Sequence, residues 1–267
     1  MRRHNKDLTE FIRACGDLAE AIYDAIADIV GTPEAGERIK IGADGTPTKR
    51  IDQIAEDIVV DYFTDSRFCR HLVSEELGCT DMGGERGTIF LDPIDGTYNA
   101  TVGIPFYAFS IAYAEEGVVQ QGYVTNLATK EAFHAIRGQG AYLDGHPIQT
   151  SDTSALGKSA MSIHGPRRSD PTPLLQFGGK IRRLRLLGAS ALELCYVGCG
   201  RIDAFIDMRE TLRTTDIAAG MLICEEAGGA VSDIRGEKIA MSDEISIKKS
   251  LIATNGVIHD KIIGYLG

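Results

Sequence analysis

The segment DPIDGT at residues 92–97 combines residue types that phosphoester chemistry needs. It follows an apolar run typical of a strand, its proline stops regular pairing, and its Gly-Thr pair permits a turn into a helix. Such a turn places the carboxylates of Asp92 and Asp95 at one strand end. It also leaves the amides of Gly96 and Thr97 unpaired at a helix N-terminus, where an anion is favoured. The segment therefore predicts carboxylates that bind metal beside amides that bind phosphate.

Further acidic residues occur where other elements begin or end. Glu75 and Glu76 follow an apolar run, Asp52 begins a helix after a polar loop, and Asp216 stands at the threshold of an apolar helix. Helix caps, turns and solvated pairs are structural alternatives for each of them. Together they suit Mg²⁺, which prefers oxygen ligands and often bridges carboxylates to a phosphate. Two ions about 3.5–4 Å apart can clamp an in-line displacement. We expect two or three Mg²⁺ ions, with Mn²⁺ as a substitute.

Composition and charge narrow the function classes. Lys and Arg number 28 against 38 Asp and Glu, which gives a net charge of −10 and disfavours nucleic acid as a partner. No apolar stretch approaches the roughly 20 residues that cross a bilayer. The six cysteines form no CxxC pair, as in reduced thiols of a cytoplasmic protein. We therefore expect a cytoplasmic protein without nucleic-acid or membrane partners.

The elements that must position these residues follow from hydrophobic periodicity. Apolar residues from Leu8 to Ile29 predict a long amphipathic helix, and a second helix is predicted at 51–63, after a polar loop or loose hairpin. The middle of the chain predicts a largely antiparallel meander. After Ser151, strands alternate with helices, including a helix from about Pro171 and a strand at 181–187. We expect an N-terminal α+β lobe at 1–150 with most metal ligands, and a C-terminal α/β lobe at 151–267 with Asp216 and the wall for the substrate ring.

The motifs together resemble the inositol monophosphatase family. The matching positions are Glu75-Glu76, the DPIDGT segment, residues 215–220 and the stretch from Asp44 to Asp52, and the likeness extends over nearly the whole chain. The variant looks most like archaeal members that act on both inositol monophosphate and fructose 1,6-bisphosphate. The resemblance implies a five-layered αβαβα sandwich and a Mg²⁺-dependent phosphatase of a small phosphate ester. It also implies a homodimer.

The resemblance also implies a role for each matching position. Catalysis would use Glu75, Thr97 and Asp52, with Thr97 hydrogen-bonded near Glu75 to orient the attacking water. The implied metal ligands are Glu75, Asp92, the carbonyl of Ile94, Asp95, Asp216 and Asp52. The phosphate would bind Gly96 and Thr97, close to Asp95 and Asp216. As a hypothesis, the loop with Asp44 and Thr46 is mobile and closes over the metals.

The motifs say less about which residues would bind the ring of the substrate. Thr215 replaces the family's usual Trp, and the segment from Asp207 to Asp216 is about two residues longer than in animal enzymes. Asp207 is a candidate for binding substrate hydroxyls. A bisphosphate needs a second anion site, for which arginines are suited by their bidentate contacts. The candidates are Arg167, Arg168, Arg185, Arg201 and Arg213.

Two other functions stay open. The first keeps the metals but takes a 3′-phosphoadenosine bisphosphate or a dinucleotide phosphate as substrate. The second is a non-catalytic protein that binds metal and a sugar phosphate. A haloacid-dehalogenase-type phosphatase is disfavoured, because that chemistry needs an Asp-x-Asp pair early in the chain, whereas this chain has Asp-x-x-Asp in mid-sequence.

Overall fold

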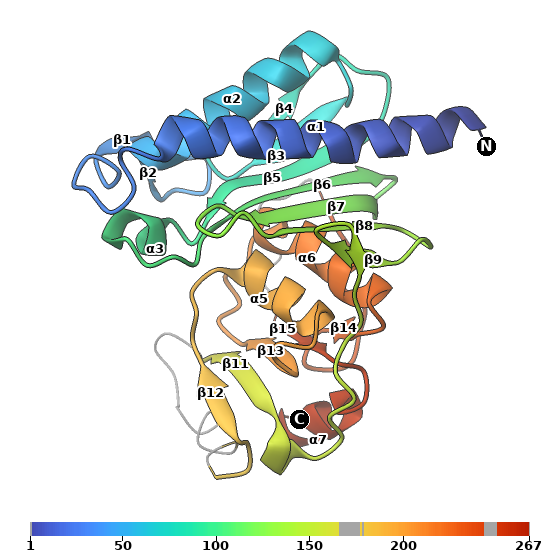
Figure 1. The fold of residues 1–267 in the computed structure, drawn as a ribbon. Helices are drawn as coiled ribbons and strands as arrows, with labels where there is room; N and C mark the ends of the chain where they lie inside the picture. Colours follow the sequence, from blue (N-terminus) through green and yellow to red (C-terminus); the bar gives the residue numbers. More distant parts are fainter. Residues whose placement is uncertain (1, 166–176, 178, 243–249, 267) are drawn as a thin grey trace.

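A computed structural model describes residues 2–165, 177, 179–242 and 250–266. Five layers are stacked in it, as Figure 1 shows: two helices, a large sheet, two central helices, a smaller sheet and a C-terminal helix. The predicted αβαβα sandwich is confirmed. The predicted helix from about Pro171 falls largely outside the described residues.

The large sheet is built from eight strands in the order β10-β9-β8-β7-β6-β5-β3-β4. Every neighbouring pair is antiparallel except β3 and β5, which are parallel. The meander predicted from sequence is thus confirmed. The strands are β3 (His71–Ser74), β4 (Gly78–Asp81), β5 (Thr88–Asp95), β6 (Ala108–Glu115), β7 (Val118–Asn126), β8 (Ala132–Ile136), β9 (Ala141–Leu143) and β10 (His146–Pro147).

Helices cover both faces of this sheet. The outer layer is α1 (Arg2–Ile26) and α2 (Arg50–Ser66), and the central layer is α5 (Ser190–Gly198) and α6 (Thr214–Glu226). Because α2 and α6 lie on opposite faces, β5 is buried over nearly its whole length and shows no polar alternation. Glycines allow the close approach of α6. A Cβ at Gly122 would lie 2.9 Å from Ala219 Cα, and one at Gly220 would lie 2.7 Å from Leu194 Cβ.

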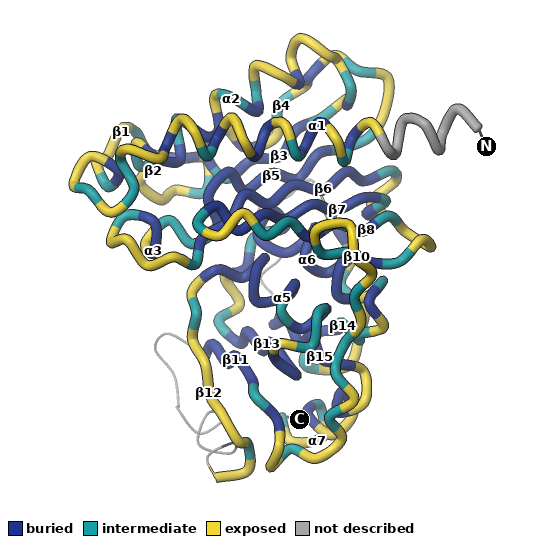
Figure 2. The backbone as a smooth tube through the Cα atoms, in the orientation of Figure 1, coloured by how far each residue is buried: buried dark blue, intermediate teal, exposed yellow. Residues whose placement is uncertain are grey.

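The smaller sheet has the order β12-β11-β13-β15-β14, with parallel pairs around β11 and antiparallel pairs around β15. Its strands are β11 (Ala160–His164), β12 (Arg183–Arg185), β13 (Ala204–Asp207), β14 (Ala230–Ser232) and β15 (Leu251–Thr254); a 3₁₀ turn at Leu156–Lys158 precedes β11, and α7 (His259–Leu266) follows β15. The strand predicted at 181–187 is therefore shorter than expected. Figure 2 shows that burial is greatest in the sheets and the central helices.

The central helices join the two halves of the chain. One continuous apolar cluster contains Val73 and Phe90 of the large sheet, Leu222 of α6, and Phe205 and Leu251 of the smaller sheet. The expected boundary near residue 150 separates the two sheets, but each sheet buries one face against the same helical layer. Asp216 at the start of α6 is thereby held against the end of β5.

Two small elements complete the framework. The polar loop contains a hairpin of β1 (Arg38–Ile41) and β2 (Pro47–Lys49), and α3 (Thr97–Val102) follows β5 directly. Gly96 makes the strand-to-helix turn with φ +86°, and a Cβ there would lie 3.0 Å from Ala189 Cβ. Asn99 fastens α3 to the segment before α5, because its Nδ2 donates to the carbonyl oxygens of Phe106 and Leu187 at 2.8 Å.

Candidate metal centre

Three carboxylates from distant parts of the chain meet where β3, β5 and α6 converge. Glu75, Asp92 and Asp216 each offer an oxygen, and these oxygens lie within 4.8 Å of one another. Asp92 and Asp216 are buried, and Glu75 is nearly so. Carboxylates this close repel one another strongly in a medium that excludes water, so the arrangement requires a compensating cation.

Asp92 provides the observation that a metal fits here. Its Oδ1 accepts a hydrogen bond from the Ile94 amide at 3.1 Å, whereas its Oδ2 is buried with no hydrogen-bond partner among the described residues. A buried acceptor without a donor is costly unless a cation or an ordered water satisfies it. The all-oxygen donor set of the cluster suits Mg²⁺ or another hard divalent ion.

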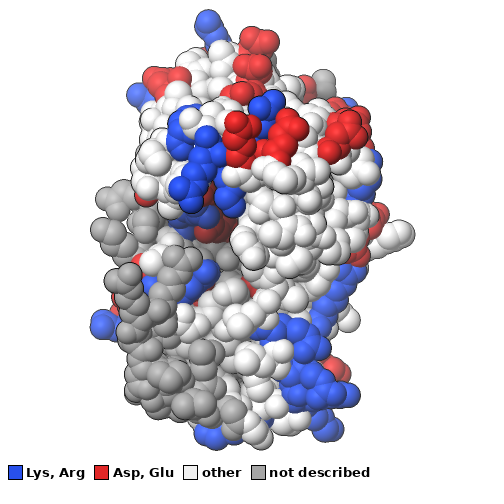
Figure 3. Space-filling view, turned by 90° about the vertical axis from the view of Figure 1, so that its left-hand side faces the viewer, with Lys and Arg blue, Asp and Glu red and all other residues white. Residues whose placement is uncertain are grey.

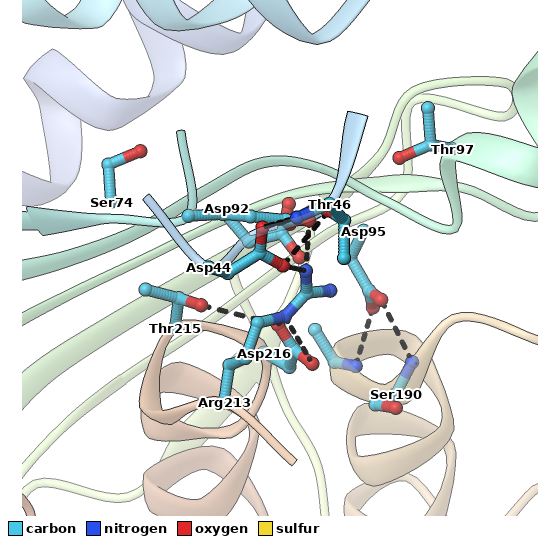
Figure 4. Close-up of polar contacts among 12 residues, drawn as sticks. Asp44, Thr46, Ser74, Asp92, Asp95, Thr97, Ser190, Arg213, Thr215 and Asp216 are labelled. Carbon is cyan, nitrogen blue, oxygen red and sulfur yellow. Dashed lines mark hydrogen bonds and ion pairs between the residues drawn. The ribbon is translucent and has the colours of Figure 1, made fainter. Parts of the chain in front are cut away.

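Asp95 lies beside the cluster, but its carboxylate turns toward α5 (Figure 4). It accepts hydrogen bonds from the Ser190 amide at 3.1 Å and the Ala191 amide at 2.6 Å. It therefore caps the N-terminus of α5, where a negative charge is favoured by the helix dipole. Asp95 is not part of the three-carboxylate group, and its predicted role as a metal ligand stays a prediction.

A half-buried arginine occupies the space among the carboxylates. The Arg213 Nε donates to Asp216 Oδ1 at 2.9 Å, its Nη1 lies 3.1 Å from Asp44 Oδ2, and Nη1 also pairs with Glu75 Oε1. Figure 4 shows the guanidinium pointing into the group from the start of α6. Sequence reasoning had named Arg213 only as a candidate for a second phosphate. The structure makes it an internal counter-ion of the three-carboxylate group.

Burial dominates the electrostatics of the cluster. It raises the pKa of Glu75 well above its usual range, although the Arg213 charge lowers it, and it raises the pKa of Asp92 in the same way. The pKa of Asp95 is also raised, first by burial and then by the Asp216 charge. Burial therefore makes ionisation of these carboxyls more costly, and binding of a divalent ion is linked to loss of protons.

Asp52 forms an adjoining part of the site. It lies in the first turn of α2, where its Oδ2 accepts a hydrogen bond from the Lys49 amide at 3.2 Å. Burial raises its pKa to about 7, against a hydrogen bond from Thr97 that lowers it. The Thr97 hydroxyl also donates to the Ile94 carbonyl at 3.0 Å. Its carboxylate partner is Asp52, whose charge acts on Glu75, and the expectation that Thr97 is hydrogen-bonded near Glu75 stays a prediction.

The β1–β2 loop lies over this group. The Asp44 amide donates to the Glu75 carbonyl at 3.3 Å, and the Ala43 amide donates to the Glu76 carbonyl at 3.1 Å. Asp44 in turn accepts from the Thr46 amide at 2.7 Å and from the Thr46 hydroxyl. The loop thus brings Asp44 into contact with Arg213, as expected for a segment that closes over the cluster. Its mobility stays a prediction.

The same face of the molecule is hollowed. Figure 3 views the side that carries β1, β2 and α3 in Figure 1, and acidic atoms lie at the base of the hollow with basic atoms on parts of its rim. The helix α3 contributes amides here. Its first intrahelical bond runs from the Ala100 amide to the Gly96 carbonyl, which leaves the Gly96 and Thr97 amides without intrahelical partners.

Polar residues at the ends of β11 and β13 extend the site on its C-terminal side. Asp207 is fully buried and accepts from the Arg209 amide at 2.8 Å and from the Arg209 Nε at 2.9 Å. Arg209 also interacts electrostatically with Asp216 and Glu193. Glu193 forms a buried pair with His164, whose Nε2 lies 2.8 Å from Glu193 Oε2. Asp207 therefore lies close to the cluster but is already paired with an arginine.

Two predicted phosphate-binding arginines lie elsewhere. Arg201 follows the C-terminus of α5, the end opposite Asp95, where it pairs with both carboxylate oxygens of Glu131 and stacks on Tyr196 at 4.7 Å. Its guanidinium is engaged in this packing, and its role in binding substrate stays a prediction. Arg185 is exposed on the edge strand β12 and donates to the Leu184 carbonyl at 3.0 Å. Arg167 and Arg168 lie outside the described residues.

The comparisons with known proteins agree with this geometry. The model of the inositol monophosphatase family matches residues 7–266. The chain belongs to the inositol monophosphatase family. Members of this family are phosphoric monoester hydrolases and generally depend on metal ions, in keeping with the acidic cluster.

Three relatives illustrate the range of the match. The chain is 43% identical over 262 residues to a protein of Methanothermobacter thermautotrophicus named fructose-1,6-bisphosphatase/inositol-1-monophosphatase, and 92% of each chain is covered. It is 36% identical to a bifunctional NADP phosphatase/NAD kinase of Methanococcus maripaludis, of which it spans 48%. A Pyrococcus horikoshii structure described as similar to inositol-1-monophosphatase superposes with a TM-score of 0.84 at 32% identity, covering 97% of each chain.

Several contacts in the site were missed by sequence reasoning. These are the counter-ion role of Arg213, the Ser190 and Ala191 amides on Asp95, the Asp207–Arg209 pair and the His164–Glu193 pair. An arginine three residues before an acidic residue at a helix start is the one signal that pointed to Arg213.

In the part of the chain that the structure describes, no helix has the length and apolar character needed to span a membrane.

Proposed function

We propose that this chain is a Mg²⁺-dependent phosphomonoesterase that hydrolyses inositol 1-phosphate, fructose 1,6-bisphosphate or both by attack of water on phosphorus. The observation that carries the proposal is the convergence of Glu75, Asp92 and Asp216, with one buried Asp92 oxygen that has no donor among the described residues. A divalent cation would satisfy that oxygen, and the phosphatase family supplies the reaction class.

The ions would be held by carboxylates from both halves of the chain. Glu75, Asp92 and Asp216 form the shared core of the site, and the Ile94 carbonyl and Asp95 are next to it on the same turn. Asp52 would hold a further, more labile ion together with Glu75. When bound, Mg²⁺ acts as a Lewis acid that lowers the pKa of water and offsets phosphate charge.

The proton is handled by Asp52 and Thr97. The Thr97 hydroxyl orients the attacking water, and the Asp52 carboxylate to which it is hydrogen-bonded accepts the proton. On the side of the cluster away from Asp52, the ion pair with Arg213 keeps Glu75 charged.

The substrate is placed by backbone amides and by the wall beyond Asp216. The phosphate is received by the Gly96 and Thr97 amides at the start of α3, where two donors lack intrahelical partners. The ring lies toward Asp207 and Arg209. We propose Arg209 as a ligand for a second phosphate, because it lies beside Asp207 and near enough to the metal centre for its charge to act on Asp216.

A second candidate substrate is NADP or another nucleotide bearing a terminal phosphomonoester. It is favoured by relatives named bifunctional NADP phosphatase/NAD kinase, which are 36% and 37% identical over 94% of this chain. This chain spans about half of the length of those proteins. The metal centre would be the same, and only the residues that contact the substrate beyond its phosphate would differ.

Phosphate release from a substrate panel separates these functions. We expect kcat/KM for inositol 1-phosphate or fructose 1,6-bisphosphate to exceed that for NADP and 3′-phosphoadenosine 5′-phosphate by at least about tenfold in Mg²⁺. Removal of the ion with EDTA, or the Asp92→Asn variant, should abolish release. The reverse ranking would favour the nucleotide substrate. Tight Mg²⁺ binding without any release would favour the non-catalytic metal- and sugar-phosphate-binding protein.

The assembly and location are further proposals. We propose a homodimer, for which the β12 edge offers a surface: Leu184 and Leu186 are both exposed there. Sedimentation equilibrium of the wild type and of a Leu184→Asp, Leu186→Asp variant tests this surface.

We also propose a cytoplasmic location, because the buried cysteines Cys15, Cys195 and Cys224 are thiols packed in the core.

A further inference from the structure

A cavity of about 300 Å³ lies on the outer side of the large sheet, away from the metal centre. It is formed between α1, the C-terminal end of α2 and strands β6 and β7. The carboxylates of the metal centre lie at the Asp92–Asp95 end of β5, whereas Arg86 at the cavity precedes the opposite end of that strand. The cavity is therefore separate from the site proposed for phosphate hydrolysis.

The walls of the cavity are aromatic. Phe11 of α1 stacks on Phe68 with ring centroids 5.5 Å apart, and Phe68 meets the Tyr113 ring edge-on at 5.3 Å. Phe63 of α2 contributes a further ring next to Phe68. Gly87 makes room for Tyr113, because a Cβ there would overlap the tyrosine ring. Rigid ring faces of this kind favour a flat aromatic guest.

A buried carboxamide lines the same cavity. Gln121 on β7 is 1% exposed, and its Oε1 has no hydrogen-bond partner among the described residues. It lies directly opposite Tyr113 in the β6–β7 ladder, so the two side chains share a face of the sheet. A carboxamide left without a partner in the interior is costly, and it offers both an acceptor and donors to a ligand.

The charges at the cavity argue against an anion. Two carboxylates, Glu10 and Glu115, line it with one arginine, Arg86. That arginine is already paired with Glu115 at 3.4 Å, and Glu115 also accepts from the Tyr113 hydroxyl at 2.7 Å. The local charge is thus net negative, which an uncharged or cationic guest tolerates and a carboxylate or phosphate does not.

We propose that this cavity is a binding site for a small, uncharged, planar heteroaromatic molecule with an amide-like edge, which pairs with the Gln121 carboxamide while its ring packs on Phe68 and Tyr113. The inference goes beyond the proposed phosphatase activity and does not depend on it. An amide edge supplies one donor and one acceptor side by side, as the Gln121 side chain does, so two hydrogen bonds form in one plane.

Nicotinamide and nicotinate are matched probes for the site. Both carry the same pyridine ring, but nicotinate replaces the amide by a negative carboxylate. We expect isothermal titration on the full-length protein with Mg²⁺ present to show nicotinamide binding with Kd of about 1 mM or tighter. Nicotinate should bind at least about tenfold more weakly, because it lacks a donor and meets Glu10 and Glu115.

Two variants locate the binding. Gln121→Leu should weaken nicotinamide binding at least about tenfold while Tm stays equal or rises, because an unpaired buried polar group is removed. Gln120→Leu is the control: it makes the same change at the neighbouring residue, which does not line the cavity and whose side chain donates to the Val118 carbonyl. It should leave binding unchanged.

Other results would overturn the proposal. These are no heat of nicotinamide binding up to about twenty times the expected Kd, equal affinity for nicotinate, or equal loss of binding in the two variants. Binding that Gln121→Leu leaves intact would place the ligand elsewhere and also refute it. Phosphatase activity is not the readout, so failure here leaves the proposed hydrolysis untouched.

Discussion

Replacing Asp52 with asparagine isolates the electrostatic cost of assembling the metal centre. Asp52 is 5% exposed, and its oxygens accept hydrogen bonds from the Lys49 amide and from Thr97. Asparagine has nearly the same shape and its Oδ1 can still accept such a bond. The substitution therefore removes a buried negative charge with little change in packing.

The expected magnitude follows from the shifted pKa. Burial raises the pKa of Asp52 from 3.8 to about 7, so the folded protein holds this proton more tightly than the unfolded chain does. Between about pH 4 and pH 7 the unfolded state binds fewer protons, and the free energy of unfolding therefore falls as pH rises. The difference between the two pKa values of Asp52 lowers the free energy of unfolding by about 4 kcal/mol once pH exceeds 7. An asparagine side chain does not titrate, so the variant avoids this loss.

We therefore expect Asp52→Asn to stabilise the metal-free protein at pH 8 by about 2–4 kcal/mol, or roughly 5–15 °C in Tm. At pH 4.5 the difference should fall to about 1 kcal/mol, because the folded wild-type carboxyl is then protonated and only the unfolded one is still mostly ionised. Saturating Mg²⁺ should reverse the order at pH 8, because ligation of Asp52 would stabilise the wild type alone. Urea unfolding in EDTA and in Mg²⁺ at both pH values measures these differences.

The control is Asp57→Asn, an exposed aspartate on the same helix that accepts from the Gln53 side chain at 2.6 Å. It should shift stability by less than about 0.5 kcal/mol at either pH. If Asp52→Asn destabilises the metal-free protein at pH 8, or if its effect does not change with pH, the argument that Asp52 is held charged at a cost is refuted.

Four further predictions concern the same site. Thr97→Val should lower kcat by about 10²–10⁴-fold with little change in KM, measured by phosphate release; an unchanged kcat would remove Thr97 from proton transfer. Gly96→Ala should cost about 2–3 kcal/mol in urea unfolding, because Gly96 has φ +86° and Ala189 Cβ lies 3.0 Å from the new methyl; a neutral result would contradict the tight turn. Arg213→Gln should lower the metal-free stability by about 3 kcal/mol and raise Mg²⁺ affinity at least about tenfold in calorimetry, because the guanidinium competes with Mg²⁺ for Glu75. Weaker Mg²⁺ binding by the variant would refute the counter-ion role. Mg²⁺ affinity should rise from pH 6 to pH 8 with proton release, since burial raises the pKa of the ligand carboxyls; pH-independent binding would show that they are ionised beforehand.

Much of the architecture follows from local patterns. The period-3.6 apolar spacing that begins at Leu8 locates α1, and short apolar runs between glycine turns locate the meander. The turn at Gly96 was also predictable, because Gly-Thr after a proline-interrupted strand has few alternatives. Boundaries shifted by a few residues, as at β12, where only the central part of the expected strand pairs with β11.

The partners of polar side chains were less predictable, because they depend on contacts between residues far apart in sequence. Thr97 pairs with Asp52, since α2 presents its first turn to the end of β5. Asp95 turns to the amides of α5, about 95 residues later. The fold also places Glu131 and Tyr196 around Arg201, contacts that no local pattern indicated.

The sequence by itself determined which carboxylates this protein offers and the order of the elements that carry them, because hydrophobic periodicity and turn chemistry act over a few residues. Only the tertiary structure decided that Glu75, Asp92 and Asp216 share one buried space, and that Arg213 stands among them. The reason is that burial against both faces of the large sheet brings α6 onto β5. Proximity between residues 124 positions apart, Asp92 and Asp216, is a property of that packing and of no local pattern.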